Sequence, residues 1–168
     1  MSELIEKAKQ FAKTAHAGQK RWSGADYYEE HLLAVYDITS KFIENNQDIL
    51  KEWYRHTDIT SEKILAASLL HDIVEDTTVT HKDILQEFGQ DVALIVNILT
   101  RPRDMEYAEY IFSIVDGIWE HNIVAALIKM ADLTHNSSNF PIEKRNNKYS
   151  KYLLSMRLIQ NYLEDYEF

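Results

Sequence analysis

The sequence predicts an all-α fold, and three observations support this class. Only four Gly and two Pro occur among 168 residues, so few positions favour turns or break helices. Apolar residues recur at three- and four-residue spacing along most of the chain, whereas the strict alternation of β-strands is rare. Hydrophobic residues form 45% of the composition, which is enough for one packed core. We therefore expect a single helical domain over residues 1–168.

The first two predicted helices lie on either side of a polar loop. Gly18 suits the left-handed conformation that follows a helix end, and the loop continues through Gly24. His31 begins a second apolar stripe, so its side chain is expected on the buried face of the next helix. The first stripe consists of Leu4, Ile5, Ala8, Phe11, Ala12 and Ala15, and the second of His31, Val35, Ile38 and Phe42.

A strongly apolar helix is predicted to lead into a charged segment. Thr60 or Ser61 can cap its start, and its body from Ile64 to Leu70 contains one polar residue, a serine. The helix runs directly into the His71-Asp72 pair, which opens the segment His71-Asp72-Ile73-Val74-Glu75-Asp76-Thr77. The stretch 45–60 before this helix is polar and mixed, and its pattern leaves its role open.

Five more helical segments are expected in the second half of the chain. Thr80 with Asp83 resembles a capping box at the start of a short helix that closes at Phe88-Gly89. Arg101-Pro102 later interrupts the helical pattern, because the residue before a proline disfavours helical geometry. The other helices are expected at 92–99, 106–119, 123–135 and 143–166, and the apolar stripe of the last one is interpreted as core packing.

The charge balance limits the classes of partner. With 27 acidic and 18 basic residues the net charge is −9, which repels polyanions, so we expect no nucleic acid and no membrane as a partner. A small phosphorylated nucleotide stays compatible, because a metal ion can dominate the field inside a pocket. The N-terminus shows neither a signal-peptide pattern nor a long apolar run, so we expect a cytoplasmic protein.

The segment from His71 to Asp76 concentrates charge at the end of an apolar helix. Residues four apart share a helix face, so His71 is paired with Glu75, and Asp72 with Asp76. Three carboxylates this close repel one another, and the preceding apolar stretch suggests partial burial, where unpaired charge is costly. A bound cation would relieve the repulsion. Because the chain has no cysteine, the ligands would be His, Asp, Glu and neutral oxygen groups.

Two distant residues complete a candidate ligand set. His31 lies on an apolar helix face, and Asp132 follows the hydrophobic stretch Ile123 to Ile128 on an expected interior helix. Together with His71 and Asp72 they form two imidazoles and two carboxylates on three inward-facing helices. Such a set suits Mn²⁺, Fe²⁺, Zn²⁺ or a similar ion.

The order His, His-Asp, Asp resembles the HD superfamily of phosphohydrolases, whose fold is the HD-domain helical bundle. The nearer similarity is to the hydrolase domains of the Rel and SpoT alarmone enzymes and to stand-alone hydrolases of the metazoan SpoT homologue type. The Glu75-Asp76 pair is its most discriminating part, and the similarity covers residues 11–140. The stretches that carry it are Ala15–Arg21 with Ser23-Gly24 and Tyr27, Ala66–Thr77, Phe88-Gly89 with Val92 and Val96, and Lys129–Asn136.

This resemblance implies a reaction and a role for each site residue. One divalent metal, usually Mn²⁺ in these relatives, and two water-handling carboxylates would remove the 3′-pyrophosphate of a guanosine alarmone, ppGpp or pppGpp. An arginine would lie against the purine. The implied metal ligands are His31, His71, Asp72 and Asp132, the implied catalytic residues are Glu75 and Asp76, and the implied substrate contacts are Arg21, Ser23 and Asn136.

Two departures from the family pattern concern substrate recognition. Trp22 stands where relatives usually have lysine, and Ser137-Ser138-Asn139 stands where they tend to have Met-Arg-Thr. One alternative is therefore an HD phosphatase or phosphodiesterase for another nucleotide, such as NADPH or a cyclic or modified nucleotide. Another is a non-catalytic nucleotide-binding regulator with a structural metal, although the intact Glu75-Asp76 pair argues against it. The sequence leaves the native metal and the oligomeric state open.

Overall fold

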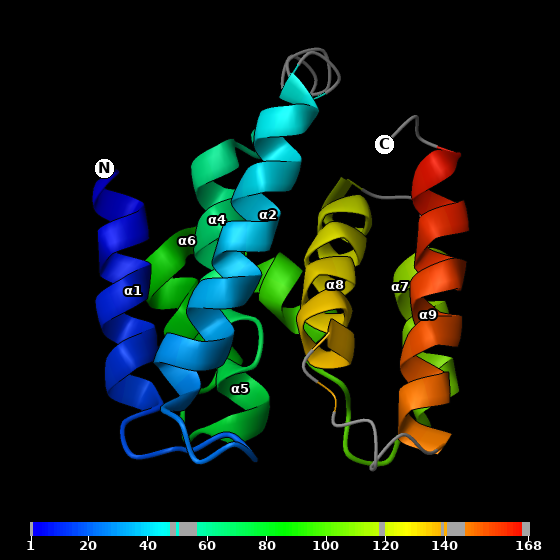
Figure 1. Cartoon of the computed structure of the whole chain (residues 1–168). Helices are drawn as coiled ribbons and strands as arrows, with labels where there is room; N and C mark the ends of the chain where they lie inside the picture. The colour runs from blue at the N-terminus through cyan, green and yellow to red at the C-terminus, as the bar shows by residue number, and fades with distance from the viewer. Residues whose placement is uncertain are drawn as a thin grey trace.

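The computed structural model describes residues 2–47, 50, 57–117, 120–138, 140 and 147–165. Within these residues every regular element is a helix, and a single isolated bridge joins Lys20 to Asp26, so the predicted all-α class is confirmed (Figure 1). In chain order the helices are α1 (Glu3–Ala15), η1 (Tyr28–Leu32), α2 (Leu33–Asn45), α4 (Ser61–Leu70), α5 (Ile73–Asp76), α6 (His81–Leu99), α7 (Tyr107–Val115), α8 (Glu120–Ser138) and α9 (Asn147–Glu164).

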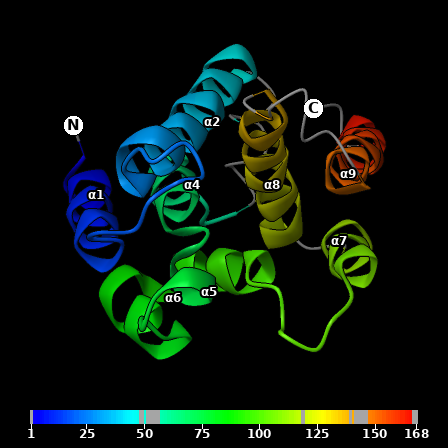
Figure 2. The same ribbon diagram turned by 60° about the horizontal axis from the view of Figure 1, so that its bottom comes forward.

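Helix α8 lies in the middle of the bundle. It contacts α2 and α6 on one side and α7 and α9 on the other (Figure 2). Its residues Asn122–Ile128 are all buried, which confirms the predicted interior helix. Because close packing surrounds this helix, the polar side chains on its following turns are held in fixed positions.

The second predicted helix begins differently from the expectation. It starts as the π-helical turn η1 and continues as α2, and His31 within η1 is buried as predicted. The buried face of α2 is formed by Val35, Thr39 and Ile43, whereas the predicted Ile38 and Phe42 are only partly buried. A π-turn closes its hydrogen bond over one more residue than an α-turn. The turn η1 therefore changes which side chains of α2 face the core.

The prediction of a continuous helix through His71-Asp72 is wrong. Helix α4 ends at Leu70, and α5 is a separate four-residue helix that starts after Asp72. Asp72 has φ −102° and ψ −1°, a sparsely populated backbone region between helix and strand. The resulting turn separates the two pairs, His71 with Glu75 and Asp72 with Asp76, that a continuous helix would have aligned.

Several predicted helix boundaries are confirmed. The Thr60 side chain caps α4, and Thr80 with Asp83 forms a capping box at the start of α6. Gly89 has φ +80° inside α6, so the two predicted stripes meet at a kink that glycine tolerates. None of the described helices combines the length and apolarity that crossing a membrane requires. Half of the stretch 45–60, residues 48, 49 and 51–56, lies outside the described residues, as do residues 118, 119, 143–146 and 166 of the predicted helices.

Candidate metal centre

Three segments bring two histidines and two aspartates together. His31 comes from η1, His71 and Asp72 from the turn between α4 and α5, and Asp132 from α8. One ligand atom of each residue lies within 4.8 Å of the others, so the four groups could hold one metal ion. His31 and His71 are each 1% exposed and Asp132 is 4% exposed. Asp72 is half-buried, and burial of the other three polar side chains requires strong compensating interactions.

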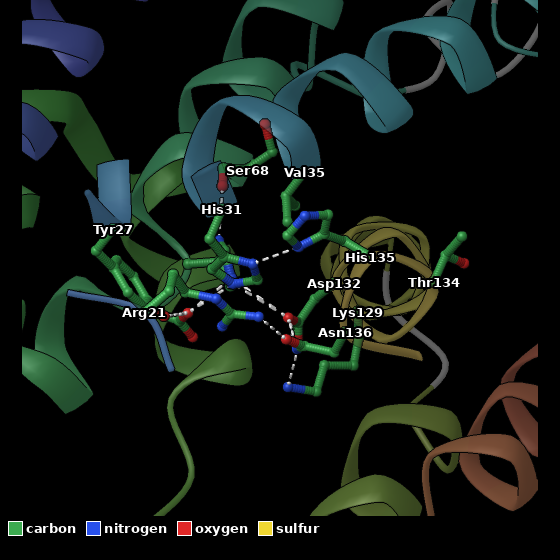
Figure 3. A network of polar contacts seen from close by, with 12 residues as sticks. Arg21, Tyr27, His31, Val35, Ser68, Lys129, Asp132, Thr134, His135 and Asn136 are labelled. Atoms are coloured by element: carbon green, nitrogen blue, oxygen red, sulfur yellow. Dashed lines mark hydrogen bonds and ion pairs between the residues drawn. The ribbon is translucent and has the colours of Figure 1, made fainter. Parts of the chain in front are cut away.

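The two carboxylates lie between the two imidazoles. The Nε2 atom of His31 is 3.2 Å from Asp72 Oδ2 and 3.3 Å from Asp132 Oδ1. The Nε2 atom of His71 is 2.9 Å from Asp72 Oδ2 and 3.8 Å from Asp132 Oδ1. Figure 3 shows Asp132 projecting from α8 toward His31, while Thr134 of the same helix points away.

The hydrogen bonding of His71 fits a metal ligand. Its Nδ1 lies 2.8 Å from the carbonyl oxygen of Ser68, which can only accept, so Nδ1 carries the proton in the neutral ring. The lone pair of Nε2 then points into the cluster. This buried nitrogen has no hydrogen-bond partner among the described residues, although it lies 2.9 Å from Asp72 Oδ2. A divalent cation would satisfy both this lone pair and the facing carboxylates.

His31 is oriented by a second histidine. Its Nδ1 lies 2.8 Å from Nδ1 of His135, and the two rings are tilted with centroids 5.0 Å apart (Figure 3). Burial, together with the neighbouring His31 and Arg21, lowers the pKa of His135 to about 4. His135 is therefore neutral and can accept the His31 Nδ1 proton. That arrangement leaves His31 Nε2 available to a metal.

Each aspartate of the cluster is held by neighbouring side chains. Tyr27 donates from its hydroxyl to Asp72 Oδ2 at 2.5 Å. Lys129 donates to Asp132 Oδ2 at 2.8 Å, and Asn136 donates to Asp132 Oδ1 at 2.5 Å. Burial alone would raise the pKa of Asp132, but the Lys129 ammonium and the site histidines hold it below its usual range. Both carboxylates are thus ionised and fixed in orientation.

Metal affinity is expected to increase with pH up to about pH 9. Burial alone would lower the pKa of His71, but Asp72 and Asp132 raise it to about 9 in the metal-free protein. Below that pH an ion must displace one proton from His71, so affinity should increase about tenfold per pH unit. Calorimetric titration with Mn²⁺ between pH 6.5 and 8.5 measures this slope and the proton released per ion. An affinity independent of pH would contradict the assignment of His71 as a ligand.

Glu75 and Asp76 lie at the exposed side of the same site. The Oε1 atom of Glu75 accepts a hydrogen bond from the backbone N–H of Arg101 at 2.5 Å. Loss of water around its carboxyl raises the pKa of Glu75, although the Arg101 N–H opposes this effect. Asp76 accepts a hydrogen bond from Gln19 at 2.9 Å. The predicted water-handling pair is therefore beside the metal cluster, on α5.

A pocket of about 300 Å³ opens onto this cluster. Arg21 and Asn136 both line it, and Arg21 donates to Asn136 Oδ1 at 2.9 Å (Figure 3). Ser23 is not among the described residues that line the pocket, and its hydroxyl donates a hydrogen bond to Glu30. Further lining residues are Trp22, Tyr27, His31, Asp72, Glu75, Asp76, Tyr107, Lys129, Asp132, Leu133, Phe140, Lys148 and Tyr152.

Sequence reasoning missed several residues of this site. Tyr27 and Lys129 hold the two aspartates, and their positions four before His31 and three before Asp132 could have indicated a shared helix face. Tyr152 of α9 lines the pocket, whereas its stripe was interpreted as core packing alone. That stripe also included Leu153, which is 46% exposed. Packing of α9 against α8 and α7 could not be read from the pattern of α9 by itself.

Comparisons with known proteins agree with this geometry. A family model described as HD domain matches residues 8–113. A guanosine-3′,5′-bis(diphosphate) 3′-pyrophosphohydrolase of Aquifex aeolicus is 29% identical over 99% of this chain and 24% of its own length. The corresponding Haemophilus influenzae protein is 33% identical over 74% of this chain and 17% of its own length. The chain thus spans a quarter or less of these curated relatives.

A solved structure is similar over nearly the whole chain. It is that of a metazoan ortholog of SpoT that hydrolyzes ppGpp and plays a role in starvation responses. The TM-score is 0.71 and the sequence identity is 26%, with coverage of 97% of this chain and 86% of the other. The similarity therefore concerns the helical arrangement of nearly the whole chain.

Proposed function

The chain belongs to the HD domain family, and on this basis we propose that it is a metal-dependent hydrolase that removes the 3′-pyrophosphate of guanosine alarmones such as ppGpp. The observation that carries the proposal is the buried cluster of His31, His71, Asp72 and Asp132, which opens into a pocket with two further carboxylates. The net charge of −9 favours a small nucleotide over a polynucleotide as substrate.

In this proposal the four clustered residues hold one divalent ion. Their nitrogen and oxygen donors suit a borderline or hard cation, and we propose Mn²⁺. A bound ion would polarise the scissile phosphate and lower the pKa of water in the site. Lys129 keeps Asp132 ionised, and Tyr27 keeps Asp72 turned toward the cluster.

Glu75 and Asp76 orient the attacking water and accept its proton. Their exposed positions on α5 leave them accessible to a substrate in the pocket. The raised pKa of Glu75 makes it a stronger base than an ordinary glutamate, which suits proton transfer near neutral pH. Pyrophosphate leaves as the phosphorus–oxygen bond to the ribose 3′ oxygen breaks, and that oxygen is reprotonated.

Arg21 and Asn136 are proposed to contact the nucleotide. The Arg21 guanidinium lies at the pocket wall, 5.8 Å from the centre of the Tyr27 ring, and its plane would stack on a base bound there. Trp22 is 56% exposed beside it and offers a second stacking surface. Ser23 would reach a substrate only by exchanging its bond to Glu30.

A basic cavity next to the site supports a substrate with two phosphorylated positions. This cavity of about 370 Å³ shares Glu75, Tyr107, Lys129, Lys148 and Tyr152 with the pocket. It adds Arg101 and Lys151, so its wall contains four cationic side chains in a chain that is acidic overall. A second phosphate group extending away from the scissile one would meet these charges.

The proposed activity is tested with a nucleotide panel in the presence of Mn²⁺. We expect pyrophosphate release from ppGpp, and a lower kcat/KM for guanosine 3′-diphosphate, which lacks the 5′ phosphates. NADPH and cyclic nucleotides are the comparison substrates, and Fe²⁺, Zn²⁺ and Mg²⁺ complete the metal series. Release of pyrophosphate from ppGpp no faster than by a His71→Ala variant would refute alarmone hydrolysis.

One observation favours a second candidate, an HD phosphatase for another nucleotide. Trp22 lines the pocket where family members usually have lysine, so one cation is replaced by an aromatic surface. Such a surface suits stacking on a second base or nicotinamide-like ring. Phosphate release from NADPH at a higher kcat/KM than pyrophosphate release from ppGpp would support this candidate instead.

A further inference from the structure

We propose that Gln19 is a positioning residue that fixes the carboxylate of Asp76, an inference that rests on the proposed water-handling role of Asp76. The side-chain amide of Gln19 bridges two groups. Its Nε2 donates to Asp76 Oδ2 at 2.9 Å, and its Oε1 lies 2.6 Å from Nδ1 of His16. Gln19 and Asp76 are 57 residues apart, so this contact exists only in the folded chain.

The chemistry of the two neighbours determines the direction of both hydrogen bonds. An ionised carboxylate only accepts, so Gln19 must turn its NH₂ group toward Asp76. Its carbonyl oxygen then faces His16, and the His16 Nδ1 must donate. The bridge therefore runs from a buried imidazole through a neutral amide to the carboxylate, with one orientation for each group.

The anchor of this bridge is well held. His16 is 2% exposed, and its ring stacks on Tyr27 with an interplanar angle of 18° and centroids 5.2 Å apart. Its Nε2 is buried and has no hydrogen-bond partner among the described residues. A buried nitrogen without a hydrogen-bond partner is unfavourable. We attribute the presence of histidine here to the hydrogen bond between its other nitrogen, Nδ1, and Gln19.

The loop that follows α1 thus holds both ends of α5. Tyr27 donates to Asp72 immediately before α5, and Gln19 donates to Asp76 at its last residue. The Gln19 backbone is itself tied, because its N–H donates to the His16 carbonyl and its carbonyl accepts from the Tyr27 N–H. A four-residue helix has little stability alone, so these two bonds help to fix the positions of Asp72 and Asp76.

A neutral amide suits the task of holding a base. It occupies Oδ2 and fixes the side chain, while Oδ1 accepts no hydrogen bond within the part of the chain that the structure describes. A lysine or arginine in the same place would stabilise the charged carboxylate and weaken it as a proton acceptor. Gln19 therefore orients Asp76 without neutralising it.

The test compares Gln19→Glu and Gln19→Met with the wild-type protein, all loaded with Mn²⁺. Gln19→Glu keeps an oxygen that accepts from His16 Nδ1. It replaces the NH₂ group that donates to Asp76 with a negatively charged carboxylate oxygen. We expect kcat for the best nucleotide of the panel to decrease about 10- to 100-fold in both variants, because the water-handling group is misplaced. KM and metal content should stay at the wild-type values. Gln86→Glu, an exposed glutamine on α6, is the matched control and should leave kcat unchanged.

Two further readouts separate positioning from folding. The acidic limb of the kcat–pH profile should move to higher pH in Gln19→Glu, because the added negative charge favours protonation of its neighbour. A crystal structure of Gln19→Met should show Asp76 in more than one rotamer, whereas a crystal structure of the wild type should show one.

An unchanged kcat together with a single Asp76 rotamer overturns the inference, and so does a loss of activity that parallels loss of metal or a lower Tm. If the wild type hydrolyses no nucleotide, the proposed function fails, and the rotamer comparison still decides the role of Gln19.

Discussion

Replacing His71 with alanine is expected to abolish tight metal binding and to lower kcat/KM for nucleotide hydrolysis by about 10³-fold, because metal catalysis contributes several kcal/mol. His71 Nε2 is the buried nitrogen that faces Asp72 and Asp132, and it has no hydrogen-bond partner among the described residues. Without it, three ligands remain, and two of them are carboxylates that repel each other. Equilibrium dialysis with Mn²⁺ and the nucleotide assay measure the two losses.

His121→Ala is the matched control for this variant. His121 lies on α8 and, like His71, it pairs with a carboxylate, that of Asp91 at 3.1 Å, but it is not among the residues that line the pocket. Its replacement should leave metal content and kcat/KM unchanged. Wild-type metal content in His71→Ala would contradict the candidate metal centre, and thermal unfolding of both variants shows whether either has lost its fold.

Glu75→Gln and Asp76→Asn are expected to retain the metal but to lose turnover. General base catalysis contributes about 10²- to 10⁴-fold, so kcat should decrease by that factor in each variant while KM changes little. Both substitutions keep the size of the side chain and remove its ability to accept a proton. Steady-state kinetics with ppGpp, or with the best nucleotide of the panel, together with metal analysis, check this expectation.

The matched control is Glu62→Gln, the same change at an exposed position in the first turn of α4. It should leave kcat at the wild-type value. Full activity in both Glu75→Gln and Asp76→Asn would exclude this pair from the reaction. A wild-type protein that binds ppGpp and Mn²⁺ but turns over no nucleotide would favour the non-catalytic regulator.

The residues of the metal cluster could be predicted because each belongs to a local pattern. His31, His71 and Asp132 stand within or directly after apolar helical stretches, and burial of those stretches brings them inward. The same reasoning failed at His71-Asp72, where it extended one helix through a turn. The spacing of apolar residues reports only on the local chain. An interruption of two residues between helices, as at His71-Asp72, does not alter that spacing enough to be recognised.

The sequence by itself determined the helical class, the buried positions of the candidate ligands and the neighbouring Glu75-Asp76 pair, because these depend on spacing along one segment. Only the tertiary structure decided which side chains support them. His135 contacts His31 across 104 residues, and Gln19 reaches Asp76 across 57. Such pairings depend on how α8 and the loop after α1 pack around the site, and periodicity within one helix carries no information about the partner on another.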